Sequence, residues 1–277
     1  MEDGSLPTRI TTTDNLSFTI DSINNKNRVG NNLFHSFKEF SIPTNGSAIF
    51  NNSTDVVNII NRVTGGNISK IDGLIKANGK ANLFLINHTG IVFGKDARLD
   101  IGGSFFGSTA QSIKFADDIE FSAIDMKTPP LLSINVPLGL QMGNNSAAIE
   151  VQGNGYTNAS NDNNSLQVKS GQTFALIGGD IYLKGGVIKV DSGKVELGSV
   201  KEGLVNINSS SESLLNYDDI EHFGNINFSK MALADASGEG SGSIQLKARN
   251  IFIGDGSKVF IQSRGLKSGG KINVNAA

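Results

Sequence analysis

The chain has 277 residues, a formal net charge of −2 and no cysteine. This charge balance provides no strong field for binding nucleic acid or an anionic membrane, and the lack of cysteine excludes disulfides, thiolate metal sites and cysteine nucleophiles. Glycine is frequent, with 33 residues, while hydrophobic residues make up 38% of the chain. Such a composition is typical of short strands joined by tight turns, in which glycine supplies positive φ angles.

Residues 1–50 contain short segments in which apolar and polar residues alternate. These segments lie at 9–12, 16–20, 34–40 and 48–50. Pro7 and Pro43 stand at segment edges, where a missing N–H group is harmless. Because the end of an open stack of strands exposes unpaired backbone groups, we predict that residues 1–50 form an N-terminal β cap.

Residues 58–112 carry the clearest pattern in the chain. Apolar residues occur in short bursts of period two, and Gly, Asn or Asp separates the bursts. Bursts of this kind between turn-forming residues predict strands, and they recur too quickly for helices to lie between them. Within 54–64 the apolar residues also have helical spacing, but the β-branched residues there favour a strand.

Residues 115–165 interrupt this pattern. Three prolines (Pro129, Pro130 and Pro137) and a polar run at 154–164 fall in this range. We predict an excursion outside the stack, with a hairpin or edge strands near 131–136. The polar run is typical of a mobile surface loop.

From residue 166 the repeat resumes and continues to 277. Residues 179–197 can be laid over 242–261 with one insertion, and 270–274 begins another copy. Three short strands in about 20 to 30 residues are one coil of a solenoid, and stacked coils bury a continuous apolar column. We therefore predict a single all-β domain over 1–277. Frequent Asn residues suit its turns and stacked Asn ladders, and we expect the chain to stop in mid-solenoid.

A set of spaced residues between 59 and 91 forms a recognisable phrase. Its members are Ile59–Gly65 (IINRVTG), then Ser69, Ile71, Gly73, Ile75, Ala77, Gly79 and Ala81, and finally Asn87, Gly90 and Ile91. This phrase resembles the secretion domain of two-partner-secreted proteins, the filamentous-haemagglutinin-type exoproteins. The flanks at 30–37 and 101–115 resemble the cyanobacterial branch. One departure is that His88 and Thr89 replace the Pro and Asn of the family's Asn-Pro-Asn-Gly-Ile.

The resemblance implies a right-handed parallel β-helix of the pectin-lyase-like kind. The general preference for right-handed crossover connections agrees with this handedness. It implies recognition by the periplasmic POTRA domains of a TpsB (Omp85-type) outer-membrane transporter. It also implies that the domain templates β-helix folding outside the cell. The protein would be secreted or held at the cell surface after crossing the periplasm, with its signal peptide already removed. We expect no cofactor, no nucleic-acid partner, no stable membrane insertion and a monomer.

Six residues are candidates for the secretion motif: Asn87, Gly90, Ile91, Asn51, Asn52 and Asn61. An Asn at a strand end can hydrogen-bond to neighbouring backbone, and Gly allows a turn with positive φ. The resemblance implies that Asn87 and Gly90 support secretion together with an upstream Asn-rich turn, and Asn51–Asn52 occupies the place of that turn. Two roles are open: stabilising a turn, or contacting the transporter directly.

The sequence has little that suggests catalysis. His35, His88 and His222 lie far apart, and no metal-binding spacing joins them. Two clusters of carboxylate side chains could bind calcium or serve in acid–base chemistry. The first cluster is Asp117, Asp118 and Glu120, and the second is Asp218, Asp219 and Glu221. The first cluster alternates with apolar residues as a solvated strand face does. We predict no catalytic or metal-binding residues; the alternatives are a β-helix polysaccharide-active enzyme and an adhesin module that binds a glycan or host surface.

Overall fold

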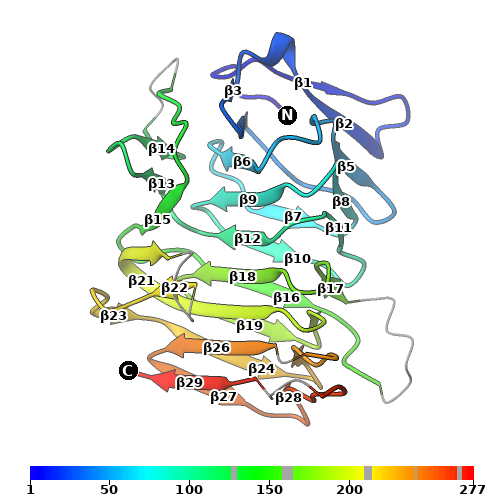
Figure 1. Cartoon of the computed structure of the whole chain (residues 1–277), viewed down its shortest axis with the longest axis vertical. Coiled ribbons are helices and arrows are strands. Elements are labelled where there is room, and N and C mark those ends of the chain that lie inside the picture. The colour runs from blue at the N-terminus through cyan, green and yellow to red at the C-terminus, as the bar shows by residue number, and fades with distance from the viewer. Residues whose placement is uncertain (126–129, 158–164, 209–213, 241, 267–269) are drawn as a thin grey trace.

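The computed structural model describes residues 1–125, 130–157, 165–208, 214–240, 242–266 and 270–277. Figure 1 shows one column of stacked coils with the N-terminal strands at one end and the C-terminal strands at the other. Among the described residues, helical structure is confined to a 3-10 turn at Ile23–Asn25, and no helix there could span a membrane. The predicted all-β parallel β-helix is confirmed.

Three walls of parallel strands enclose the column. Wall A contains, in spatial order, β4 (Asn32–Phe37), β6 (Asn58–Val63), β9 (Asn82–Asn87), β12 (Phe105–Ser108), β18 (Thr173–Gly178), β21 (Lys194–Ile207), β26 (Ser243–Ala248) and β29 (Ile272–Ala276). Wall B contains β2 (Ser17–Ser22), β5 (Ser47–Phe50), β8 (Leu74–Ala77) and β11 (Arg98–Asp100), and then β17 (Leu166–Gln167), β20 (Val187–Lys189), β25 (Leu233–Asp235) and β28 (Lys258–Phe260). Wall C contains β7 (Ser69–Ile71), β10 (Ile91–Phe93), β16 (Ile149–Gln152), β19 (Ile181–Lys184), β24 (Asn225–Ser229) and β27 (Asn250–Ile253).

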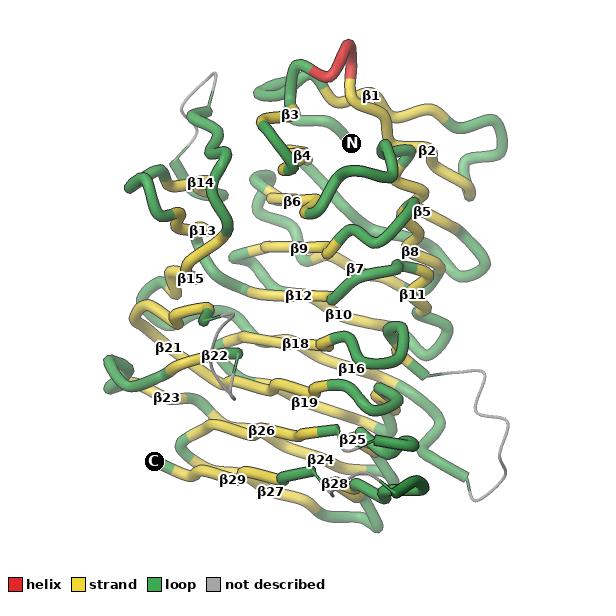
Figure 2. The backbone as a smooth tube through the Cα atoms, in the orientation of Figure 1, coloured by secondary structure: helices red, strands yellow, loops and turns green. Residues whose placement is uncertain are grey.

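Each regular coil passes from wall A to wall C, then to wall B, and back to wall A. Turns and short loops form the corners between the walls (Figure 2). Asn58 and Asn82 occupy the same position in successive coils and are 24 residues apart, whereas Asn82 and Ser104 are 22 apart. Both spacings agree with the predicted coil length.

Alternating apolar side chains fill the interior. Ile59 pairs with Leu83, and Leu83 pairs with Phe105, so their side chains stack along the column. These three side chains are buried in one continuous cluster that runs the length of the column. The period-two bursts of the sequence therefore supply the inward face of each wall.

The N-terminal end is covered by antiparallel strands. β1 (Thr8–Thr11) pairs antiparallel with β2, and β3 (Arg28–Val29) pairs antiparallel with β4. β4 and β5, which also lie within 1–50, pair in parallel with β6 and β8. The first 50 residues thus combine antiparallel edge strands with the first strands of walls A and B.

The excursion stands beside wall A (Figure 1). It consists of β13 (Ser112–Phe115), β14 (Glu120–Ser122) and β15 (Pro137–Met142), which form an antiparallel sheet with the end of β21. The predicted range of 115–165 is too long, because β16 (Ile149–Gln152) pairs in parallel with β10 and β19 in wall C. The edge strand predicted near 131–136 is wrong in position, because the strand is β15. The backbone carbonyls of Ser133 and Asn135 accept hydrogen bonds from the Asn32 side chain. Of the loop predicted at 154–164, residues 158–164 lie outside the described residues.

A second apolar cluster lies between wall A and the segments that cover its outer face. Its members include Phe34, Ile60, Ile86, Phe121 and Leu140. From β4 to β18, wall A is therefore buried on both faces, which explains why residues 83–86 of β9 form a continuous apolar run. The two short strands β22 (Leu215–Asn216) and β23 (His222–Phe223) extend this cover beside β21.

The predicted overlay of 179–197 on 242–261 is wrong by one wall. It places β19 on β26, whereas β19 belongs to wall C and β26 to wall A. The copy predicted at 270–274 has the correct phase, since β29 pairs with β26. Because each wall repeats the same apolar-x-apolar pattern, the pattern alone does not identify the wall.

Candidate functional site

The turn after β9 is built around the side chain of Asn87. This side chain is fully buried, and its Nδ2 donates to the Asn67 carbonyl and to Ser69 Oγ, both at 2.9 Å. Its Oδ1 accepts a hydrogen bond from the Thr89 backbone at 3.0 Å. Asn87 therefore closes its own turn and joins it to the corner of the preceding coil.

Gly90 completes the same turn. Its N–H donates to the Asn87 carbonyl at 3.1 Å, and its φ angle is +131°. A Cβ atom at this position would lie 3.3 Å from the Ala148 carbonyl oxygen, so both conformation and space favour glycine. Ile91 follows as the first residue of β10 and is buried in the interior of the column. The structure thus brings Asn87, Gly90 and Ile91 together at the corner between walls A and C.

Asn51 and Asn52 lie at a different corner, between walls B and A. Asn52 is 6% exposed, and its Oδ1 accepts from the Asn78 backbone N–H at 2.9 Å while its Nδ2 donates to the Asn78 carbonyl at 3.0 Å. The exposed Asn51 side chain donates to Asp21 Oδ1 at 2.8 Å. This Asn-rich turn therefore binds two successive coils to each other but does not meet the turn at Asn87.

Asn61 points into the interior of the column, between the inward-facing Ile59 and Val63 of β6. It is fully buried, and its Nδ2 donates to the Phe84 carbonyl at 2.8 Å. The six candidate residues consequently occupy three separate places. What Asn52 and Asn87 share is an amide that bridges neighbouring coils.

Arg62 is a buried residue that the sequence did not single out. Its guanidinium donates to Ser36 Oγ at 2.7 Å, to Ser5 Oγ at 3.0 Å and to the Ser122 carbonyl. It also lies 4.5 Å from the centre of the Phe121 ring. These partners come from the first residues of the chain, from β4 and from β14, so Arg62 fastens three segments together. The sequence signal was an arginine inside a strand whose Ile59, Ile60 and Val63 are apolar.

The groups considered for catalysis are dispersed. His35 lies in the interior, His88 in the turn after Asn87, and His222 is exposed on β23. Glu120 is exposed and Phe121 buried on β14, as predicted for a solvated strand face, whereas Asp118 is exposed in the turn before β14, with a φ of +59°. Within the described ranges, no three His, Cys, Asp or Glu side chains lie close enough together to hold a metal ion.

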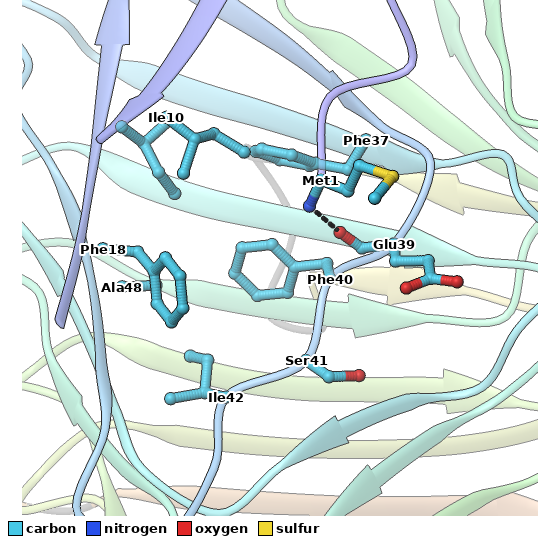
Figure 3. A pocket seen from close by; sticks show the side chains of 10 residues that line it. Met1, Ile10, Phe18, Phe37, Glu39, Phe40, Ser41, Ile42 and Ala48 are labelled. Carbon is cyan, nitrogen blue, oxygen red and sulfur yellow. Dashed lines mark hydrogen bonds between the residues drawn. The ribbon is translucent and has the colours of Figure 1, made fainter. Parts of the chain in front are cut away.

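A small apolar pocket of about 140 Å³ lies under the cap (Figure 3). Ile10 and Phe18 face Phe40 across it, and the Met1 ammonium donates to the Glu39 carbonyl at its rim. Its lining is mostly apolar, with Glu39 as its carboxylate, and it includes none of the six candidate residues of the secretion motif.

Comparison with known proteins gives one family and one fold. The model of the TPS secretion domain family matches residues 1–246. The HMW1 secretion domain from Haemophilus influenzae has a similar structure, with a TM-score of 0.50 and 19% identity over 97% of this chain and 82% of that chain. The filamentous hemagglutinin secretion domain aligns with a TM-score of 0.40 and 11% identity over 97% of each chain. No curated protein sequence matches the chain.

Proposed function

The chain belongs to the family of two-partner secretion (TPS) domains, and from this membership we propose that it is the export signal of an exoprotein, read by the periplasmic POTRA domains of a TpsB transporter. TPS domains work with TpsB transporters and belong to secreted exoproteins. The family is a secretion-domain family and not an enzyme family. The match over residues 1–246 is the observation that carries the proposal.

In this proposal, Asn87 and Gly90 act by making the first coils fold. The amide of Asn87 is fully buried and uses both of its polar atoms inside the protein, so a transporter could not reach it in the folded domain. At the corner between walls B and A, the hydrogen bonds between the Asn52 side chain and the Asn78 backbone likewise hold two successive coils together. Folding of these coils outside the cell would then hold the emerging chain and keep it from sliding back.

The stacked walls support a templating role for the domain. Each strand of wall A offers its backbone groups to the next strand in parallel register, and the apolar interior continues from coil to coil. A coil cannot bury its inward face alone, so each new coil folds best on one already formed. Growth from the N-terminal cap is therefore the order of folding that we propose, with the domain acting as a monomer.

Export with and without the transporter tests this function. The chain is produced with a signal peptide in a Gram-negative host, alone or together with its cognate TpsB protein, and the medium is assayed for folded protein. We expect export that depends on the transporter and falls strongly in the Asn87→Ala, Gly90→Ala double variant. Export that is independent of the transporter would contradict the assignment, and full export of the double variant would contradict the role of the turn.

A further inference from the structure

In the part of the chain that the structure describes, two side-chain polar atoms inside the column have no hydrogen-bond partner: Nε2 of His35 and Oδ1 of Asn61. Both side chains are fully buried. Their residues are paired neighbours in the register of β4 and β6. Unpaired polar atoms in an apolar interior are rare and strongly unfavourable, so two of them on adjacent strands indicate a shared partner.

The other contacts of the His35 ring determine which nitrogen carries its proton. Nδ1 lies 3.0 Å from Thr8 Oγ1 and 3.5 Å from Nδ2 of Asn27. The Asn27 nitrogen is identified by its bond to the Phe34 carbonyl, and an amide nitrogen can only donate. Nδ1 is therefore the acceptor. Burial lowers the pKa of His35 to about 3, so the ring is neutral and its single N–H is on Nε2.

The orientation of the Asn61 amide is fixed in the same way. Its Nδ2 donates to the carbonyl of Phe84 in β9, which can only accept. β9 lies on one side of β6 and β4 on the other. With its nitrogen toward β9, the amide directs Oδ1 toward β4, where His35 lies. A donor, Nε2–H, and an acceptor, Oδ1, thus belong to two adjacent strands and do not bond to each other directly. Neighbouring strands in a sheet are about 4.8 Å apart.

We propose that one buried water molecule bridges His35 and Asn61, accepting a hydrogen bond from Nε2–H and donating one to Oδ1. Water is the ligand that matches the pair, because a single oxygen atom both accepts and donates. Buried waters in proteins bind at such places, where they satisfy polar groups that the chain itself leaves unpaired.

This bridge marks the two coils nearest the cap. At the same interior position the following strands of wall A have Leu85, Gly107, Leu176, Leu197 and Leu246. If the stack slipped by one coil, Asn61 or His35 would face a leucine and its polar atoms would remain unpaired. The bridge therefore fixes the register in which the first two coils stack, as a buried Asn does in a coiled coil. This inference is independent of the role in secretion.

The wild-type protein provides the first test. Nitrogen chemical shifts of a His-labelled sample at pH 7 should show His35 with its proton on Nε2, and a crystal structure that resolves ordered water should show one water within hydrogen-bonding distance of Nε2 and Oδ1. A proton on Nδ1, or a site without water, overturns the proposal.

Substitution provides the second test. His35→Leu and Asn61→Leu should each lower the thermal midpoint by about 4 °C or more, since each leaves the other member of the bridged pair without its partner. His35→Leu also removes the contact to Thr8 and Asn27, and Asn61→Leu removes the donor to the Phe84 carbonyl, and the double variant does not recover these losses. The double variant, which repeats the leucines of the later coils, should regain at least half of the summed loss. Additive losses overturn the proposal. As a control, His35→Leu with Asn58→Ala should be additive, and if a single variant fails to fold, the wild-type measurements decide.

Discussion

The coils next to the cap and the coils that follow them share three walls but are held together differently. Near the cap, amides link the strands of wall A: Nδ2 of Asn58 donates to Oδ1 of Asn32 at 2.9 Å, and Nδ2 of Asn82 donates to Oδ1 of Asn58 at 3.0 Å. In the later strands Thr173 and Lys194 occupy the same register position.

The two regions therefore contribute different things to the fold. Hydrogen bonds between amides require one geometry, so the coils near the cap define where each strand stacks. Apolar rungs such as Leu176, Leu197 and Leu246 bury area but fit one another almost equally well in several registers. Within wall A, the amide links thus set the register of the first coils, and the later strands continue that register mainly through apolar contacts. Wall C differs, because Nδ2 of Asn250 donates to Oδ1 of Asn225 at 2.9 Å in the later coils.

The largest expected effect is at Arg62. Arg62→Met keeps the side-chain volume but removes the three hydrogen bonds to Ser5, Ser36 and the Ser122 carbonyl, which join three segments. We expect a loss of about 3–5 kcal/mol in the free energy of unfolding, measured by chemical denaturation. Hydrogen exchange should also increase together in residues 1–6 and in β14. A loss below about 1 kcal/mol would show that the coils near the cap do not depend on this contact.

Ile86 gives the apolar counterpart, because it pairs with Arg62 on the outer face of wall A. It is 1% exposed, and Ile86→Ala should lower the free energy of unfolding by about 2–5 kcal/mol through lost burial and the cavity that remains. Ile68, which is 44% exposed, is the matched control, and Ile68→Ala should change the stability by less than about 1 kcal/mol. Equal losses in the two variants would show that burial does not determine the effect.

Glu196 should make the later coils less stable as the pH rises towards neutrality. It lies buried on the outer face of β21, and burial raises the pKa of its carboxyl from 4.5 to about 7. The unfolded chain loses this proton more readily, so the contribution of Glu196 to stability should fall by about 3 kcal/mol as the pH rises from 4.5 to 7. Because other groups titrate in the same range, the check is the difference in unfolding free energy between the wild type and Glu196→Gln, which should change by that amount between pH 4.5 and pH 7. A difference that stays constant across this range would contradict the shift.

His35 makes the coils near the cap sensitive to acid. Burial lowers the pKa of its ring from 6.5 to about 3, so the unfolded chain takes up a proton that the folded chain does not. Stability should therefore fall as the pH drops below 6.5, by about 2 kcal/mol at pH 5. Comparing each pH profile with that of His35→Leu isolates this contribution. If the stability of the variant falls below pH 6.5 as steeply as that of the wild type, the assignment is wrong. The slopes of stability against pH that His35 and Glu196 contribute should have opposite signs.

The sequence was sufficient for the architecture because its signals are local. Period-two bursts between turn formers predicted β7, β8, β9 and β10, and the motif at Asn87 predicted a turn with a glycine at its end. The phase of the later repeat could not be read in the same way, since the segments IYL (181–183), IKV (188–190) and VEL (195–197) have the same apolar-x-apolar pattern on three different walls.

The polar contacts near the cap were beyond sequence reasoning for a different reason. Arg62 meets Ser5 across 57 positions and the Ser122 carbonyl across 60, and nothing local indicates these partners. Asn87 was predicted to be a site residue from its motif, but its bonds to Asn67 and Ser69 follow from the stacking of one coil on another. Contacts between coils become visible only when the register is known.

The central claim is that the secretion motif works by folding the coils near the cap, and paired measurements on two matched variants test it. Asn87→Ala removes an amide from the motif, and Asn58→Ala removes one from the ladder outside the motif; both bridge successive coils. Each should lower the free energy of unfolding by about 1–3 kcal/mol. Transporter-dependent export of both should fall in proportion to that loss. If Asn87→Ala lost export while keeping its stability, or Asn58→Ala lost stability and was exported normally, the motif would be read directly and the claim would be wrong.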